Sequence, residues 1–283
     1  MHDSAVLSRR QVVQALSVAG FALAVQPIVA ETVILTDSAG LAADWVEIPV
    51  ADGKIPAYFA RPKTGSAPLI LVVQEIFGVH SYIQDVCRRL AKAGYAALAV
   101  DLYHRQGDAT KAPDIDTLID TIVSKVPDAQ VMSDLDAAVA WAKQDGHADT
   151  TRLGVTGFCW GGRITWLYAE HNPAVNAAVA WYGKLVGKPG ATPDPLHPTQ
   201  PIDQVGTLKA PVLGLYGGKD QGISQESIAA MKAALKAAGN PSQFHIYPDA
   251  PHGFHADYRP SYRQADAEDG WRRLLAWFKQ HGL

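Results

Sequence analysis

Uninterrupted apolar runs recur along this chain, and each leaves room for a helix before the next run begins. The runs lie at residues 68–74, 95–103, 152–157, 175–182 and 211–217. A continuous apolar run is typical of a strand that is buried on both faces. Helical patterns follow the runs, at 83–93, 114–124, 129–144, 163–170, 224–238 and 262–279. This alternation predicts an α/β fold with one mostly parallel sheet and helices on both faces.

Three further strands complete the predicted sheet. The segments WVEIPV (45–50) and KIPAYFAR (54–61) flank an Asp52-Gly53 turn, which is typical of a β-hairpin. A last segment with alternating polarity lies at 242–248. We therefore expect an eight-stranded sheet that opens with an antiparallel hairpin.

Nothing in the sequence divides this pattern into separate domains. We find no internal repeat and no linker, and we expect the proline-rich stretch 187–207 to form a long irregular loop. A single domain over 31–283 follows. The net charge is −3 and no lysine or arginine cluster is present, which argues against a nucleic-acid partner.

The first 30 residues have the composition of an export signal. A pair of arginines (9–10) precedes an uncharged stretch at 11–30, and a cut before Glu31 would follow a small residue. We interpret 1–30 as a twin-arginine signal peptide, which predicts a periplasmic protein with no stable membrane insertion after cleavage. The alternative is a retained membrane anchor, because the uncharged stretch is about long enough to span a bilayer. Ile28 also stands where a small residue is preferred.

The chain has two cysteines, Cys87 and Cys159, which are too few for a disulfide framework. Cys87 has apolar neighbours at helical spacing, so we interpret it as a buried helix residue. Cys159 stands in the glycine-rich segment VTGFCWGG (155–162). An unpaired thiol in an oxidising compartment is a liability unless the protein uses it.

The segment around Cys159 fits a nucleophile elbow, the sharp strand-to-helix turn that presents a catalytic side chain. Gly157 and Gly161 stand two residues before and after the thiol, where only small side chains fit because backbone segments approach closely. The turn would place the thiol at a helix N-terminus, where the helix dipole lowers a thiol pKa from about 8.5. The alternative is that the glycines only let a helix pack closely on the sheet, as in nucleotide-binding folds.

Two later strand ends supply partners for a thiol nucleophile. Asp220 directly follows a buried strand, and His252 follows the next one. Nucleophile, acid and histidine occur in this order in α/β-hydrolases. Taken alone, Asp220 could be a turn former or helix cap, and His252 could be an exposed loop residue or one of a metal pair with His255. No matching cluster of carboxylates or cysteines supports a metal site, and nothing calls for a cofactor.

Four sequence motifs, which follow one another along most of the chain, support the prediction of a thiol hydrolase. They are QEIFGVHSYIQDVCRRLAKAGYAALAVDLYHRQG, GVTGFCWGGR, GGKDQ and PHGFH. Over residues 45 to 280 the sequence resembles the dienelactone hydrolase family of α/β-hydrolases. The resemblance implies the α/β-hydrolase fold and a triad of Cys159, His252 and Asp220. It also implies hydrolysis of small-molecule esters or lactones through a thioester.

The resemblance assigns three further positions near the thiol. It implies that Glu75 helps to control the protonation of Cys159. The oxyanion hole is expected from the backbone N–H groups of Ile76 and Trp160, an assignment that rests on position because backbone donors leave no side-chain signature.

Arg105 matches the family position that binds a substrate carboxylate, which would make the substrate anionic. Its structural alternative is a surface arginine paired with Asp108. Family members specific for dienelactone carry a second arginine four residues after the catalytic histidine, where this chain has Ala256, and Arg259 lies three residues further on. This departure argues against dienelactone itself as the substrate.

Three other functions fit parts of the pattern. A thiol redox protein would need a resolving cysteine, and Cys87 lacks the C-x-x-C spacing. A hydrolase of another acyl class, such as a peptidase, would use the same chemistry, but no peptide-binding cleft is indicated. A non-catalytic binding protein on a hydrolase fold would keep the triad positions without using them. We expect a monomeric ester or lactone hydrolase.

Overall fold

The apolar runs form neighbouring strands of one sheet in the computed structural model, which describes residues 32–187, 190, 192 and 194–283. The predicted signal peptide lies outside the described residues. None of the described helices is long and apolar enough to cross a membrane.

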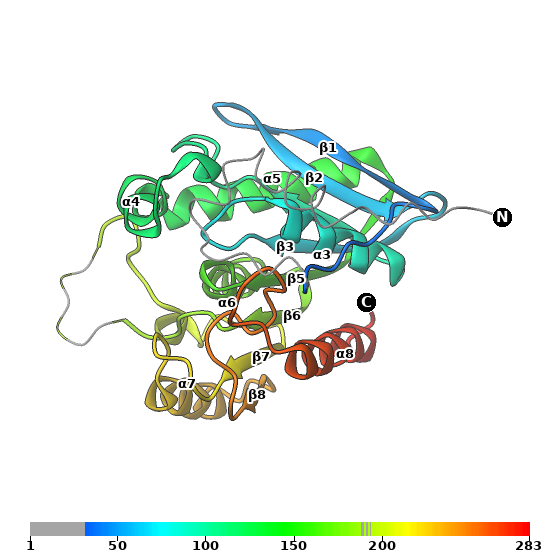
Figure 1. The fold of residues 1–283 in the computed structure, drawn as a ribbon. Coiled ribbons are helices and arrows are strands. Elements are labelled where there is room, and N and C mark those ends of the chain that lie inside the picture. Colours follow the sequence, from blue (N-terminus) through cyan, green and yellow to red (C-terminus); the bar gives the residue numbers. More distant parts are fainter. Residues whose placement is uncertain (1–31, 188–189, 191, 193) are drawn as a thin grey trace.

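The sheet has eight strands in the order β1-β2-β4-β3-β5-β6-β7-β8. Their bounds are Leu41–Val50 (β1), Gly53–Pro62 (β2), Ala67–Val73 (β3), Ala96–Val100 (β4), Ala148–Phe158 (β5), Val175–Trp181 (β6), Val212–Gly217 (β7) and Gln243–Tyr247 (β8). The β1–β2 and β2–β4 pairs are antiparallel, and every later pair is parallel. Figure 1 shows the β1–β2 hairpin at one edge and β8 at the other. The predicted eight-stranded, mostly parallel sheet is confirmed.

The helices fall between the strands as the periodicity predicts. Their bounds are Ser81–Lys92 (α3), Ile115–Thr121 (α4), Asp128–Asp145 (α5), Trp160–His171 (α6), Gln225–Ala237 (α7) and Gln264–Gln280 (α8). Short 3-10 turns lie at Ala109–Lys111 (η1), Val123–Lys125 (η2) and Pro201–Gln204 (η3). The helix expected at 114–124 is divided into α4 and η2 at Ile122, whose φ of −119° departs from helical geometry.

Helices cover both faces of the sheet. A Cβ on Gly157 of β5 would meet the backbone of α6, while one on Gly154 would lie 3.3 Å from the ring of Phe278 in α8. Successive strand residues point to opposite faces, so these two positions, three apart, mark the two helical layers. Tyr82 of α3 packs against Phe158, which shares the face of Gly154. Helices α3 and α8 therefore lie opposite α6.

A buried polar network fastens the loop that follows β8. Arg89 of α3 pairs with both Asp85 and Asp257, and all three side chains are largely buried. The N-terminal segment joins the network, because Thr36 N donates to Asp85 at 2.6 Å and Ile34 N donates to Asp257 at 3.4 Å. Paired buried charges of this kind are costly to break. The network ties the loop carrying His252 to α3.

Candidate active site

Cys159 occupies the corner between β5 and α6. Its φ of 56° and ψ of −114° lie in a region that non-glycine residues rarely adopt. Backbone strain of this kind costs about 1–3 kcal/mol and persists where the surrounding structure enforces it. Cys159 N is held by a 3.0 Å hydrogen bond to the carbonyl of Trp181 at the end of β6. The strained corner leaves the thiol half-exposed at the start of the helix.

The glycines around the thiol are required by close backbone contacts. A Cβ on Gly157 would lie 2.3 Å from the carbonyl oxygen of Gly161, and a Cβ on Gly161 would lie 2.3 Å from that of Gln74. A Cβ on Gly162 would lie 2.3 Å from the carbonyl oxygen of Trp181. None of these sites can accept a side chain. The helix therefore starts directly against β3 and β6, and the thiol is left at the corner.

His252 and Asp220 meet at the carboxyl ends of β8 and β7. His252 Nδ1 lies 2.7 Å from Oδ2 of Asp220, whose side chain is fully buried. The other oxygen of Asp220 accepts from the N–H groups of Gly222 at 2.8 Å and Ile223 at 3.2 Å. The carboxylate is thus fixed, and it orients the imidazole so that its second nitrogen is available to the thiol.

The protonation behaviour of His252 reflects Cys159 beside it. Burial lowers the pKa of His252, but the charge of Cys159 and the hydrogen bonds to Asp220 and Cys159 outweigh burial and raise that pKa to about 10. The structure thus brings Cys159, His252 and Asp220 together, from three separate strand ends.

Glu75 lies at the end of β3 and is completely buried. Its Oε2 accepts a hydrogen bond from the hydroxyl of Tyr258, while Oε1 has no hydrogen-bond partner among the described residues. Burial raises the pKa of Glu75, against opposing effects of Arg259, Tyr258 and His252. These opposing effects place Glu75 within electrostatic reach of His252.

One buried tyrosine that the motifs did not single out, Tyr182, lies beside His252. Tyr182, at the end of β6, has a φ of 37°, and its ring centroid lies 5.1 Å from that of His252. Its hydroxyl is buried without a hydrogen-bond partner among the described residues. Burial raises the pKa of Tyr182, and the charges of Glu75, Tyr258 and Cys159 add to the effect. The sequence did offer one signal for Tyr182, because a tyrosine directly after an apolar strand lies at the sheet edge where the other site residues gather.

Arg259 also lies beside the thiol. Burial lowers its pKa, but Glu75, Tyr258 and Cys159 together raise it above the usual value. The guanidinium carbon lies 5.7 Å from the ring centroid of Phe77. No carboxylate of the described residues lies within ion-pair distance of Arg259. It is therefore a guanidinium that can accept an anion.

Arg105 is engaged elsewhere. Its guanidinium makes two 2.7 Å hydrogen bonds to Asp52 and further bonds of 2.8 and 3.1 Å to Asp134. Asp108, the partner considered in the structural alternative, pairs instead with Lys111 at 3.2 Å. Arg105 links the β1–β2 turn to α5.

The backbone N–H groups of Ile76 and Trp160 are free to bind an oxyanion. Ile76 lies in the tight turn closed by the Glu75–Gly78 bridge, and Trp160 is the first residue of α6. Neither N–H donates a hydrogen bond to another described residue. Ile76 directly follows Glu75, and Trp160 directly follows Cys159. Each therefore offers an unused N–H donor next to one of these two residues.

Two residues that alternative functions would use, His255 and Cys87, are both buried. Within the described part of the chain, no three His, Cys, Asp or Glu residues are grouped to hold a metal ion. His255 is buried, and its Nδ1 lies 2.6 Å from the hydroxyl of Tyr82. Cys87 is a buried free cysteine in α3, and burial raises its pKa far above the usual value. A thiol of that kind is inert as a resolving cysteine.

The sequence pattern of the Dienelactone hydrolase family matches residues 55–282. The chain belongs to this family. It is 62% identical over 278 residues (98% of this chain, 94% of the relative) to a Methylorubrum extorquens protein named "Putative carboxymethylenebutenolidase". An Escherichia coli protein of the same name is 53% identical over 93% of this chain and 96% of its own length. The resemblance drawn from the motifs is confirmed, and the chain is a member of a family of lactone and ester hydrolases.

A solved structure agrees with this assignment. The crystal structure of a "Putative Dienelactone Hydrolase" from Klebsiella pneumoniae is 53% identical, with a TM-score of 0.82, and covers 85% of this chain and 99% of its own. The eight-stranded sheet with helices on both faces is the α/β-hydrolase fold, as predicted.

Proposed function

We propose that this protein hydrolyses carboxylic esters and lactones with a Cys159–His252–Asp220 triad, through a thioester intermediate. The observation that carries the proposal is the 2.7 Å contact between His252 and the buried carboxylate of Asp220, with the strained Cys159 corner beside the imidazole. A nucleophile, a base and an orienting acid are the three parts that acyl transfer requires.

The first half of the reaction forms the thioester. The Cys159 thiol passes its proton to His252, which forms a thiolate–imidazolium ion pair. The sulfur then attacks the carbonyl carbon, and the carbonyl electron pair moves onto oxygen to give a tetrahedral oxyanion. The N–H groups of Ile76 and Trp160 stabilise that charge. When the oxyanion collapses, the carbon–oxygen ester bond breaks, and His252 gives its proton to the departing alkoxide.

The second half releases the acid. His252, now neutral, takes a proton from a water molecule as that water attacks the thioester carbon. The carbon–sulfur bond then breaks, the Cys159 thiolate departs, and the proton on His252 restores the ion pair. The products are a carboxylic acid and an alcohol, or one hydroxy acid when the substrate is a lactone.

Glu75 is proposed to control the protonation of the thiol. Its carboxyl is buried, and its pKa is raised by burial. A carboxyl whose neutral form is favoured by burial can return a proton to the Cys159 sulfur when no substrate is bound. A protonated thiol resists oxidation better than a thiolate, which suits an exported enzyme.

The substrate is proposed to carry an anionic group, and Arg259 is the arginine that the geometry favours for it. The Arg105 guanidinium is satisfied by two carboxylates, whereas Arg259 has none within ion-pair distance in the described residues and lies in electrostatic contact with Cys159. A guanidinium can hold a carboxylate with two charge-assisted hydrogen bonds.

The test is hydrolysis of p-nitrophenyl acetate before and after alkylation by iodoacetamide, with Cys87→Ala as the matched control. Activity that is lost on alkylation in both the unmodified protein and Cys87→Ala, and is absent from Cys159→Ala, is the expected result. Full activity in Cys159→Ala would overturn the mechanism. Absence of hydrolysis of every ester and lactone tried would favour a non-catalytic binding protein.

A further inference from the structure

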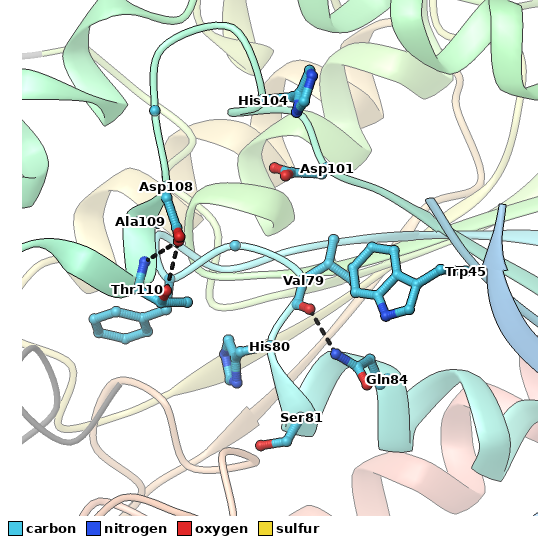
Figure 2. A pocket seen from close by; sticks show the side chains of 13 residues that line it. Trp45, Val79, His80, Ser81, Gln84, Asp101, His104, Asp108, Ala109 and Thr110 are labelled. Carbon is cyan, nitrogen blue, oxygen red and sulfur yellow. Dashed lines mark hydrogen bonds between the residues drawn. The ribbon is translucent and has the colours of Figure 1, made fainter. Parts of the chain in front are cut away.

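A cavity with a volume of about 680 Å³ opens beside the proposed active site. Ligand pockets commonly have volumes of this size. Figure 2 shows side chains from several separate segments converging around it. Its lining consists of Trp45, Phe77, Gly78, Val79, His80, Ser81, Gln84, Asp101, His104, Gly107, Asp108, Ala109 and Thr110. The cavity therefore lies at the carboxyl ends of β3 and β4, on the edge where α/β proteins bind ligands.

The cavity is connected to the catalytic residues by short steps. Phe77, which lines it, directly follows Ile76, the proposed oxyanion donor. On another side, His104 directly follows Tyr103, whose ring centroid lies 5.0 Å from that of Trp160, the second proposed donor. An ester whose carbonyl oxygen lies in the oxyanion hole has an acyl part and an alcohol part. One of these two parts would thus be able to reach the cavity.

Apart from two histidines, His80 and His104, the ionisable groups of the lining are all acidic. Asp101 and Asp108 are carboxylates, and no lysine or arginine belongs to the lining. Burial lowers the pKa of His80 to about 3, so this imidazole is uncharged. Arg259 lies over the ring of Phe77 but is not part of the lining. The cavity is therefore suited to a cation and unsuited to an anion.

Of the two carboxylates, Asp101 is the one that can still bind a cation. Asp108 already accepts from Thr110 and pairs with Lys111. Asp101 forms no ion pair with any described residue, and its carboxylate accepts one hydrogen bond among them, from Tyr103 N at 3.2 Å. Burial is the main cause that raises its pKa, with Asp108 adding to the effect and Tyr103 N and His104 opposing it, so the charged form carries a desolvation cost. A bound cation would offset that cost.

The aromatic walls suit a cation that has an apolar body. Trp45 of β1 is 45% exposed, which is unusual for so large an apolar side chain, and its indole faces the cavity together with Val79 (Figure 2). Phe77 supplies a second ring. Aromatic faces attract organic ammonium groups, and Trp does so most strongly.

We propose that this cavity binds an organic ammonium group on the alcohol part of the substrate. The inference rests on the proposed function and deepens it, because it assigns a substrate class: esters of amino or quaternary ammonium alcohols. Asp101 supplies the counter-charge, and Trp45 supplies the aromatic wall.

The experiment compares two esters of the same shape. Acetylcholine and 3,3-dimethylbutyl acetate differ only in a charged nitrogen in place of a carbon, so the ratio of their kcat/KM values isolates the charge. Hydrolysis is followed by titration of the released acid at constant pH. We expect a ratio of about 10 in favour of the cation, on the scale of one cation–π contact reinforced by a carboxylate. We expect the ratio to fall to about 1 in Asp101→Asn.

Two controls separate this inference from general damage. Asp116→Asn removes an exposed carboxylate outside the cavity, changes the net charge equally, and should leave the ratio unchanged. Retained hydrolysis of the neutral ester by Asp101→Asn shows that this variant folds. A ratio near 1 in the unmodified protein, or a high ratio that survives Asp101→Asn, would overturn the inference while the Cys159 mechanism stands.

Direct binding keeps the inference testable if no ester is turned over. Isothermal titration of choline into the unmodified protein should show binding that is weakened about 10-fold in Asp101→Asn and not in Asp116→Asn. Absence of choline binding by the folded, unmodified protein would refute the cavity assignment alone.

Discussion

The imidazole of His252 is held 2.7 Å from the fully buried carboxylate of Asp220, and the two residues come from loops after neighbouring parallel strands. The carboxylate is itself fixed by two backbone N–H groups. The imidazole therefore keeps one orientation without help from substrate. That rigidity suits a base that must take a proton from the thiol and later give it to an alkoxide.

Removal of any of the three proposed triad residues should reduce turnover, and the nucleophile and the base should matter more than the orienting acid. Cys159→Ala and His252→Ala should each lower ester kcat by roughly 10³-fold or more, and Asp220→Asn somewhat less, as is typical of groups that act as a unit. Cys159→Ser should be weak, since Glu75 and His252 are arranged around a thiol. Steady-state kinetics measure these effects, and a double variant no worse than its worst single variant would confirm the concerted action.

The pH dependence of stability should reveal the ion pair between His252 and Cys159. The pKa of His252 is raised from 6.5 to about 10 in the folded protein, despite the lowering effect of burial. A histidine with a raised pKa stabilises the fold fully below its unfolded pKa, and that stabilisation is lost as the pH rises from about 6.5 to about 10. In Cys159→Ala the loss should occur at lower pH, because the hydrogen bond and the electrostatic effect of Cys159 that raise the pKa of His252 are gone. Melting temperatures measured across this range would contradict the ion pair if the two curves had the same shape.

The choice between Arg259 and Arg105 can be decided with a charged and an uncharged substrate. Arg259→Ala should raise the KM for an ester bearing a carboxylate by about 10–100-fold, as loss of one charged partner implies, and leave a neutral aryl ester nearly unaffected. Arg105→Ala should lower the melting temperature, because Asp134 loses its partner, without changing the ratio between the substrates.

The reverse outcome would restore the family assignment. A KM effect on the anionic ester in Arg105→Ala alone would mean that Arg105 leaves Asp52 and Asp134 when substrate binds. Equal losses on both substrates in Arg259→Ala would mean that this residue supports the site and does not recognise the anion.

The sheet and the order of the triad could be predicted because they depend on local patterns. Continuous apolar runs indicate buried strands, and the cysteine corner carries its glycines beside it in the sequence. The surroundings of the thiol could not be predicted in this way. The hydrogen bond between Tyr258 and Glu75 joins residues 183 positions apart, and no local pattern records it. Asp52 and Asp134, the two carboxylates that bind Arg105, likewise come from different elements. The sequence therefore could not show that they occupy the guanidinium expected to bind substrate.

Export should depend on the paired arginines near the N-terminus, which lie outside the described residues. We propose that Arg9 and Arg10 are read by the twin-arginine machinery, so that lysine at both positions should leave the protein in the cytoplasm. Fractionation followed by N-terminal sequencing measures this, with a mature start near Glu31 expected. An intact Met1 on the exported protein would contradict cleavage.

A buried carboxyl on the helix after the nucleophile should limit stability at alkaline pH. Both oxygens of Glu170 are buried without a hydrogen-bond partner among the described residues. Burial raises the pKa of Glu170 to about 9, with Asp203 adding to the effect and Arg163 opposing it. The folded state thus holds a proton that the unfolded chain releases above about 4.5, so stability contributed by this group falls as the pH rises from about 4.5 to about 9. Glu170→Gln keeps the shape and removes the titration. It should stabilise the protein by about 1–3 kcal/mol at pH 9 and change little at pH 5, which urea unfolding at the two pH values can measure.

The control is Glu268→Gln, the same change at an exposed position, which should have no such effect. An equal gain in both variants would show that burial of Glu170 is not the cause.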